Sequence, residues 1–463
     1  MNSLSLALRN LLRNRRRSAT TLAAMVIGGV TILTFGGYSQ NIIYGLETQT
    51  VAQLGHLQIQ HKDYFLYGTG NPAAYGVPGY RRVIDVVLHD PVLAPMLTVV
   101  TPTLSLGGIA GNFAAGVSRT VFGRGVVVED QNRMRHWNEY SLPIVLQPLA
   151  LTGTGDDAVI IGKGVARVLQ LCGALGVADC PQPEAAPAQG ASAPEDIAAL
   201  ALQEAKQTPT APAGEPRIEL LASNAYGAPN VTSLRVVKAE SQGVKELDDM
   251  YVGLHLARAQ RLVYGADAPQ VSAIVIQLTS TGQIATARAR LEQILATTLK
   301  GEPLLIQEFR TLNPFYSQVV AMFGAIFGFM AVLIGAIVLF TVGNTMTMAV
   351  VERTTEIGTL RAIGLRRGGI RLLFVSEGLL LGLIGALVGV VAALGVAWLI
   401  NHSGLTWNPP GQANAIPLSV RVWGETTLIL GTAAGLVVVA VISAWWPARR
   451  AAAKNIVDAL RHV

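Results

Sequence analysis

Residues 18–46 read SATTLAAMVIGGVTILTFGGYSQNIIYGL, without a single Asp, Glu, Lys or Arg. Three later stretches, at residues 311–351, 378–402 and 426–448, share this property. A helix needs about 20 apolar residues to cross a hydrocarbon core about 30 Å thick, and each stretch contains that length. Only 14% of the chain is charged, where a soluble protein would carry about a quarter. We therefore expect an α-helical integral membrane protein with four transmembrane helices, arranged one plus three.

Basic residues flank these stretches unevenly. They precede the first stretch, lie between the second and third, and follow the fourth: Arg9, Arg13, Arg15, Arg16 and Arg17, then Arg353, Arg361, Arg366, Arg367 and Arg371, then Arg449, Arg450, Lys454 and Arg461. Because Lys and Arg mark cytoplasmic segments, we predict a multi-pass protein of the bacterial inner (cytoplasmic) membrane with both termini cytoplasmic. The net charge of +6 then reflects topology, and no basic stripe with interleaved aromatics indicates a nucleic-acid partner.

The apolar stretches divide the chain. We predict a cytoplasmic amphipathic helix at 1–17, TM1 at 18–45, a periplasmic domain at 46–310, a stalk and TM2 at 311–351, a cytoplasmic coupling loop at 352–371, TM3 at 372–401, a short periplasmic loop at 402–425, TM4 at 426–448 and a cytoplasmic tail at 449–463. The large domain contains a Pro/Ala-rich insertion at 172–216. Its composition is typical of a segment without a packed core.

Strand-like and helix-like patterns alternate in the large domain. We expect strands at 98–109, 119–128, 217–221, 231–239 and 271–278, and a helix at 281–299. This mixture over more than 200 residues predicts an α+β domain of one or two subdomains.

Two cysteines lie in this domain, at Cys172 and Cys180. In an oxidising compartment their spacing favours a small disulfide loop, with two unpaired thiols as the alternative. The seven histidines form no cluster with metal-ligand spacing, so we expect no metal site.

The chemistry of an enzyme or of an ion-driven transporter is not visible. A P-loop requires Gly-x4-Gly-Lys-Ser/Thr, and the nearest segment, residues 161–164, lacks the hydroxyl and the correctly spaced upstream glycine. Glu377 is the carboxylate within reach of a membrane helix, and we expect it to pair with a nearby cation such as Arg371. We predict a chain that is not an enzyme and that binds no cofactor itself.

Glycines four residues apart recur in the apolar stretches, at Gly324 and Gly328, Gly378 and Gly382, Gly385 and Gly389, and Gly431 and Gly435. This spacing lets helix backbones approach closely in lipid. It is consistent either with a tightly packed bundle inside one chain or with a dimer.

The segment between the second and third stretches carries the strongest motif. Residues 344–367 read NTMTMAVVERTTEIGTLRAIGLRR, in which Ile357, Leu360, Ile363 and Gly364 make an apolar edge beside charged residues. A short charged helix with such an edge suits docking in a groove of a soluble partner. The alternative is a solvated loop held by lipid headgroups.

This motif strongly resembles that of ABC transporter permease subunits of the FtsX-like, MacB and lipoprotein-releasing (LolC/LolE-like) type. The stretches 7–17 and 447–461 and the one plus three arrangement are similar too. The resemblance implies a MacB-like mechanotransmission (type VII) permease that works with a second permease copy or a homologous permease. A separate ATPase dimer would bind ATP and Mg. Its contacts would be Glu352, Arg353, Glu356, Arg361 and Gly364, with Ile357 and Leu360 as a docking ridge.

The same resemblance implies three functions. The first is extraction or export of a lipoprotein or another amphiphilic substrate, driven by the ATPase and completed by a periplasmic acceptor. The second is macrolide or peptide efflux with a periplasmic adaptor and an outer-membrane channel. The third is FtsX-like signalling across the membrane to a cell-wall hydrolase. The size of the external block favours the first two.

Overall fold

The computed structural model describes residues 7, 9, 10, 13, 15–68, 70–143, 147–178, 215–243, 245–407 and 415–454. The chain divides into two compact units. The helical unit consists of the described residues within Met1–Leu46, Phe315–Trp407 and Ile416–Val463. The sheet unit lies within Glu47–Pro314. Cys180, residues 179–214 of the expected insertion and the tail beyond 454 lie outside the described residues, so the disulfide between Cys172 and Cys180 stays a prediction.

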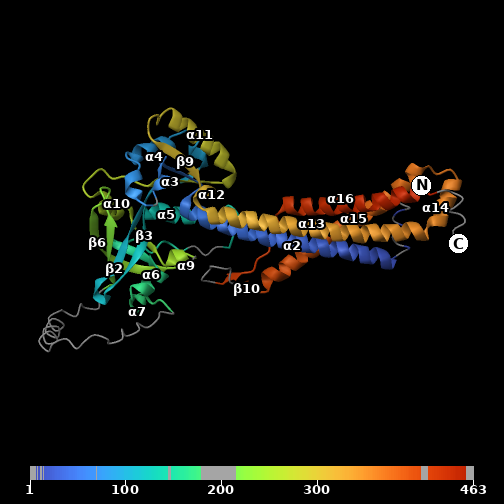
Figure 1. Cartoon of the computed structure of the whole chain (residues 1–463), viewed down its shortest axis with the longest axis horizontal. Coiled ribbons are helices and arrows are strands. Elements are labelled where there is room, and N and C mark those ends of the chain that lie inside the picture. Colours follow the sequence, from blue (N-terminus) through green and yellow to red (C-terminus); the bar gives the residue numbers. More distant parts are fainter. Residues whose placement is uncertain are drawn as a thin grey trace. The chain divides into compact units, whose positions relative to one another are not determined.

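Four long helices form the helical unit: α2 (Arg15–Leu54), α13 (Pro314–Glu352), α15 (Arg367–His402) and α16 (Thr426–Ala453). Each is long and apolar enough to cross a membrane, and each overlaps one of the four uncharged stretches. Figure 1 shows α2 and α13 side by side, with the short helix α14 (Thr354–Ala362) at one end of the unit. A two-stranded ribbon of β10 (Thr406–Trp407) and β11 (Ile416–Pro417) follows α15.

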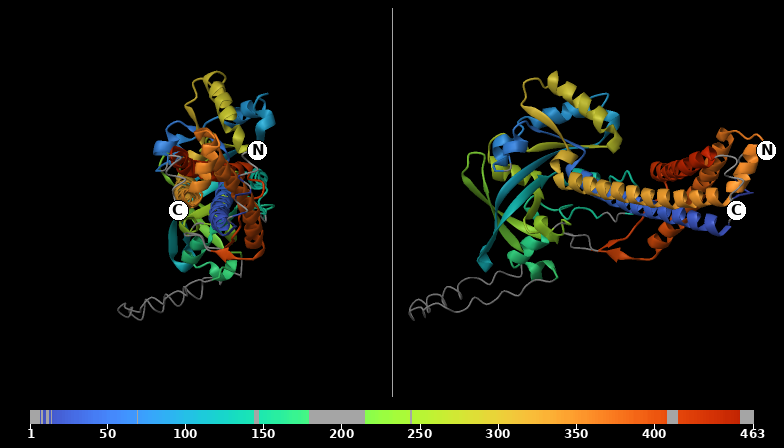
Figure 2. Two further views of the ribbon diagram at one scale, coloured as in Figure 1. Left: turned by 90° about the vertical axis from the view of Figure 1, so that its right-hand side faces the viewer. Right: turned by 45° about the vertical axis from the view of Figure 1, so that its right-hand side comes forward.

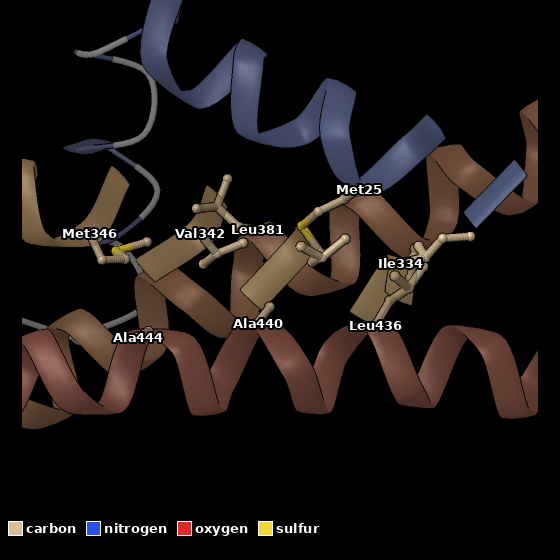
Figure 3. Close-up of a cluster of buried hydrophobic side chains, with 10 residues drawn as sticks. Met25, Ile334, Val342, Met346, Leu381, Leu436, Ala440 and Ala444 are labelled. Carbon is tan, nitrogen blue, oxygen red and sulfur yellow. The ribbon is translucent and has the colours of Figure 1, made fainter. Parts of the chain in front are cut away.

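The core of the helical unit receives side chains from all four helices. Figure 3 shows Met25 of α2 facing Leu381 of α15, with residues of α13 and α16 closing around them. The buried cluster is Met25, Ile334, Val338, Val342, Met346, Leu381, Ala386, Leu436, Ala440 and Ala444. Small residues dominate the α16 side, so that helix approaches its neighbours closely.

The α15 glycines occupy the closest helix contacts. A Cβ atom on Gly378 would lie 2.5 Å from the Cβ of Ala444, and one on Gly385 would lie 2.9 Å from the Cβ of Met25. Around Gly324, Gly328, Gly431 and Gly435 no atom of the described residues lies within 4 Å of such a Cβ. Packing inside one chain therefore accounts for the α15 glycine pairs but not for the pairs on α13 and α16.

Within the described residues, the sheet unit contains nine strands: β1 (Leu57–His61), β2 (Leu97–Asn112), β3 (Val117–Val126), β4 (Ala158–Gly162), β5 (Arg217–Ser223), β6 (Pro229–Glu240), β7 (Tyr251–His255), β8 (Ala273–Leu278) and β9 (Leu304–Glu308). Their order is β3-β7-β4-β6-β5-β2-β8-β1-β9, and β3 pairs with β2 as well. This extra pairing closes a ring of six strands. The remaining strands β8, β1 and β9 continue the same hydrogen-bonded sheet beyond β2, and we call these three strands the second sheet.

The 16-residue strand β2 is common to both parts. Residues 103–112 pair with β3 along one edge, while residues 97–103 pair with β8 and residues 108–111 with β5 along the other. Its burial does not follow the period of two of a strand with one exposed face, because consecutive residues are buried at 99–101, 103–104 and 110–111.

The helices of the sheet unit lie against these strands. Helix α4 (Tyr80–Leu88) packs on β2, and α11 (Ile284–Ala296) packs on β9 (Figure 2). The others are α3 (Tyr64–Tyr67), α5 (Val128–Arg135), α6 (Lys163–Val168), α7 (Cys172–Leu175), α9 (Lys245–Asp248), α10 (Leu256–Tyr264) and α12 (Phe309–Leu312).

The observed elements overlap most of the expected ones. The strands expected at 98–109 and 119–128 fall on β2 and β3, and the helix expected at 281–299 contains α11. Strand β1 was not expected, because its sequence LQIQH carries two glutamines that an alternating pattern would place in solvent. Both are buried, at 5% and 4% exposure for Gln58 and Gln60.

A buried histidine lies at the start of the sheet unit. His56 is fully buried, and its Nδ1 accepts a hydrogen bond from the backbone N–H of Leu278 at 2.9 Å. The proton of the neutral ring therefore sits on Nε2, which faces the hydroxyl of Thr281 at 3.3 Å. That hydroxyl in turn donates to Glu47 at 2.7 Å. Burial, reinforced by the nearby Arg310, lowers the pKa of His56 to about 3.

His56 should make the sheet unit sensitive to acid. Between pH 6.5 and 3 the unfolded chain binds a proton that folded His56 does not, so the free energy of unfolding falls as the pH is lowered through this window. In His56→Asn, thermal melts between pH 7.5 and 4 should show a flatter dependence on pH. The exposed control His89→Asn should keep the wild-type slope. Equal slopes for wild type and His56→Asn would contradict this prediction.

Close packing of α15 on α16 should likewise be measurable. Gly378→Val forces a side chain against Ala444 and the backbone of Ala440, an overpacking that typically costs about 1–3 kcal/mol. We expect a lower melting temperature in detergent, followed by tryptophan fluorescence. Gly431→Val introduces the same side chain where the described residues leave space and should melt like the wild type.

Candidate functional site

The chain turns between α13 and α14 at a single residue. Glu352 ends α13, and Arg353 precedes α14. Helix α14 ends at Ala362, and the four residues 363–366, with a turn at Gly364 (φ of +106°), connect it to α15, which begins at Arg367. Such a positive φ is accessible to glycine at little cost. The segment 352–371 is therefore a short helix held between two long ones, not an extended loop.

A buried ion pair anchors this turn. The guanidinium of Arg353 donates to Glu377 of α15 at 2.9 Å and to Glu356 of α14 at 2.9 Å, and lies over the Phe374 ring at 5.7 Å. Arg353 is 8% exposed and Glu377 3% exposed. We expected Glu377 to pair with a cation such as Arg371, but the structure pairs it with Arg353. The partner is distant in sequence because the turn folds the end of α13 back onto α15.

Residues near the N-terminus complete the cluster. Arg17 makes two hydrogen bonds to Glu352, one of them at 2.6 Å, and Arg13 donates to Glu356 at 2.8 Å. Asn10 donates to Glu377 at 2.5 Å. We call Asn10, Arg13, Arg17, Glu352, Arg353, Glu356 and Glu377 the charged cluster. It ties the start of the chain to the ends of α13 and α15.

Arg353 and Glu356 of the charged cluster favour each other's ionised forms. Burial alone would raise the pKa of Glu356, but hydrogen bonds from Arg353 and Arg13 outweigh it and leave the pKa below its usual value. For Arg353, burial lowers the pKa, while the hydrogen bond to Glu356 and the charge of Glu377 more than offset it. Both groups are therefore charged at neutral pH, and their interactions are satisfied within the chain.

The residues of the predicted apolar edge of α14 differ in their exposure to solvent. Ile357 is 3% exposed and packs with Val350, Ile370, Phe374, Ala448, Ala451 and Ala452. In the expected docking ridge of Ile357 and Leu360, Ile357 is therefore buried, because its side chain packs at the junction of α13, α15 and α16; its contact with an ATPase stays a prediction. Arg361 also points inward and donates to the backbone oxygen of Lys454, while the Lys454 amine donates to Thr354 at 3.0 Å.

Three apolar side chains remain exposed at the end of α14. Leu360 is 36% exposed, Ile363 80% and Leu365 41%. The exposed residues Arg366, Arg367 and Arg371 follow directly. We call Leu360, Ile363 and Leu365 the apolar tip. Unlike Ile357, these three residues of the predicted coupling segment are exposed to solvent.

The structure thus rearranges the predicted site residues. It brings Glu352, Arg353 and Glu356 together, but as an internal network, and it gives Gly364 a role in the turn. Contact of any of these residues with an ATPase stays a prediction. Sequence reasoning missed Asn10, Arg13 and Arg17 as partners, because the basic run was interpreted only as a topology signal. Three acidic residues at the same predicted end of the membrane helices could have indicated the pairing.

Comparison with known proteins identifies a part of the helical unit. Residues 320–456 match the FtsX-like permease C-terminal domain. This part of the chain is an FtsX-like permease domain. The matched residues include α14, the apolar tip and four of the seven residues of the charged cluster.

The chain is also similar to several named ABC transporter permeases and export proteins. The chain is 37% identical over 160 residues to the ABC transporter permease YtrF of Bacillus subtilis, covering 33% of this chain and 35% of YtrF. It is 32% identical to the pyoverdine export ATP-binding/permease protein PvdT of Pseudomonas putida, covering 50% and 33%. It is 34% identical to the macrolide export ATP-binding/permease protein MacB of Chlorobaculum tepidum, covering 26% and 16%. The chain spans about a third or less of the length of these relatives. The predicted resemblance to FtsX-like and MacB-type ABC transporter permeases is confirmed.

The buried pair should dominate the stability of this end of the helical unit. Arg353→Gln leaves Glu377 buried without its cation, a loss of about 3–5 kcal/mol, and should lower the melting temperature strongly. Arg13→Gln removes a cation whose side chain is 57% exposed, and exposed pairs contribute about 1 kcal/mol or less. Arg353→Gln combined with Glu377→Gln should recover much of the stability. Melts of all three in one detergent check the order, and equal losses for Arg353→Gln and Arg13→Gln would refute it.

Proposed function

We propose that this chain is the permease subunit of an ABC transporter in which a separate ATPase dimer drives movement of the sheet unit on the opposite side of the membrane. The observation that carries the proposal is the apolar tip, three exposed apolar side chains on a helix whose base is fixed by the charged cluster. A partner groove that accepts Ile363 would also meet Arg366, Arg367 and Arg371. Apolar anchors with a charged rim are typical of helix-in-groove recognition.

The geometry supports force transmission by α14. Arg353 and Glu356 bind α14 to α15 and to the N-terminal segment, and Ile357 packs it against α16. A displacement of the tip therefore acts on all the long helices rather than bending a loop. Helices α2 and α13, with 40 and 39 residues, would each span about 60 Å, twice the hydrocarbon core. This length supports a MacB-like mechanotransmission (type VII) arrangement with cytoplasmic termini in the inner membrane.

The substrate class is also part of the proposal. We infer export of a lipoprotein or another amphiphile, with a periplasmic acceptor and a second permease copy or homologue. Efflux through a periplasmic adaptor and an outer-membrane channel is the second candidate, favoured by relatives named for pyoverdine and macrolide export. Signalling to a cell-wall hydrolase is the third.

The apolar tip gives a direct test of the coupling function. Ile363→Asp should abolish co-purification of the ATPase with the tagged chain and reduce stimulated ATP hydrolysis at least tenfold, because a carboxylate cannot enter an apolar groove without losing its hydration. The melting temperature should stay within about 1 °C, since Ile363 is 80% exposed.

Two variants serve as controls. Ile363→Leu keeps the apolar volume and should retain the ATPase, and Leu247→Asp changes a 51% exposed leucine of the sheet unit and should also retain it. Undiminished ATPase recovery with folded Ile363→Asp would overturn the assignment of the tip. Failure to recover any nucleotide-hydrolysing partner with the wild-type chain would overturn the function itself.

A further inference from the structure

A cavity of about 380 Å³ opens in the sheet unit, within the range of small-molecule sites. Residues from β1, α3, β2, β3, β7 and α12 line it. It therefore lies where the six-strand ring and the second sheet share strand β2. No residue of the charged cluster or of the apolar tip contributes to it.

The cavity contains an arginine without a counter-ion. Arg124 of β3 donates through Nε to the Thr103 hydroxyl at 3.2 Å and through a terminal nitrogen to the backbone oxygen of Gln53 at 2.6 Å. Among the described residues no carboxylate forms an ion pair with Arg124. Burial lowers the pKa of Arg124, but a guanidinium stays protonated in proteins. The wall of the cavity therefore carries a fixed positive charge with unused N–H donors.

A second polar group of the wall lacks a partner. Gln60 of β1 is 4% exposed, and its Nε2 donates to the side-chain oxygen of Gln58 at 2.9 Å. The Oε1 atom of Gln60 has no hydrogen-bond partner among the described residues. Buried side-chain oxygens normally accept at least one hydrogen bond. A ligand with a hydroxyl or an acid proton would supply it.

The rest of the wall is aromatic and apolar. Tyr64, Phe65, Phe122, Tyr251 and Leu106 contribute to it. Phe65 is 42% exposed and Phe122 49% exposed, so both present apolar surface to solvent at the cavity. A cation, an unsatisfied acceptor and aromatic rings that line one cavity match a ligand with a polar head and an apolar chain.

We propose that this cavity binds an anionic amphiphile, with its acidic headgroup on Arg124 and Gln60 and its apolar chain along Phe65 and Phe122. A phosphate monoester fits both polar groups, because its oxygens accept from the guanidinium and its acid proton can be donated to Gln60. The proposal deepens the export function by naming the chemical class of the substrate. Binding itself requires no ATPase, so a failure here leaves the coupling function untouched.

Calorimetric titration tests the site on the full chain in phosphatidylcholine nanodiscs, with empty nanodiscs subtracted. Octyl phosphate is the probe, inorganic phosphate represents the headgroup alone and 1-octanol the chain alone. We expect octyl phosphate to bind one site per chain at least tenfold more tightly than either. Arg124→Gln should weaken octyl phosphate at least tenfold, and Phe65→Ser at least threefold.

Matched variants separate the cavity from the rest of the surface. Arg133→Gln removes an arginine whose side chain is 64% exposed, and Phe113→Ser removes a phenylalanine that is 79% exposed; both lie outside the cavity wall and should bind octyl phosphate as the wild type does. If the Arg124→Gln melt shows misfolding, Phe65→Ser decides, since its side chain is partly in solvent.

Three outcomes would overturn the proposal. Unchanged affinity in folded Phe65→Ser and Arg124→Gln would place binding elsewhere. Equal affinity for inorganic phosphate would mark a free-anion site, and equal affinity for 1-octanol would mark an apolar cavity that does not select a headgroup.

Discussion

The ion pair between Arg353 and Glu377 is the constraint on which the helical unit depends. Two charges at 8% and 3% exposure are costly to bury unless each finds partners. Arg353 finds them only if α13 ends at Glu352 and the chain folds back along α15. The same geometry brings Glu356 toward Arg13 and Glu352 toward Arg17. The position of α14, and with it the apolar tip, follows from satisfying one buried carboxylate.

Away from the charged cluster, close packing between the helices stabilises the helical unit. Lipid chains are as apolar as leucine, so apolar burial alone does not drive helices together. The contacts of Gly378 and Gly382 with α16, and of Gly385 and Gly389 with α2, supply close packing instead. The large apolar side chains of α13 such as Phe329, Val332 and Phe340, at 66%, 74% and 76% exposure, suit contact with lipid. The charged cluster thus stabilises one end of the helix bundle, and close packing at small residues stabilises the rest of its length.

The sequence predicts those features that a local rule controls. Absence of charge over 20 residues determines the four membrane helices, and regular patterns of apolar residues indicate β2, β3 and α11. Pairing across the chain follows no such rule. Asn10 and Glu377 are 367 residues apart, and the parallel pairing of β3 with β7 joins strands whose order cannot be read locally. Nor does the sequence indicate that Gln58 and Gln60 are buried or that Arg124 lines a cavity, because polar residues are usually exposed to solvent. Gln58 and Gln60 lie on β1 of the second sheet, Arg124 lies on β3 of the ring, and Gln60 and Arg124 both line the cavity.

Strand β2 determines whether the sheet unit can be divided into smaller fragments that fold. It supplies hydrogen bonds to β3 on one edge and to β8 and β5 on the other, so it completes the ring and also pairs with the second sheet, which does not contain its own complete set of strands. Cutting between them would leave one fragment with a long unpaired edge, which is a template for aggregation. The ring and the second sheet should therefore fold as one domain, despite their different topologies, and should be expressed and crystallised together.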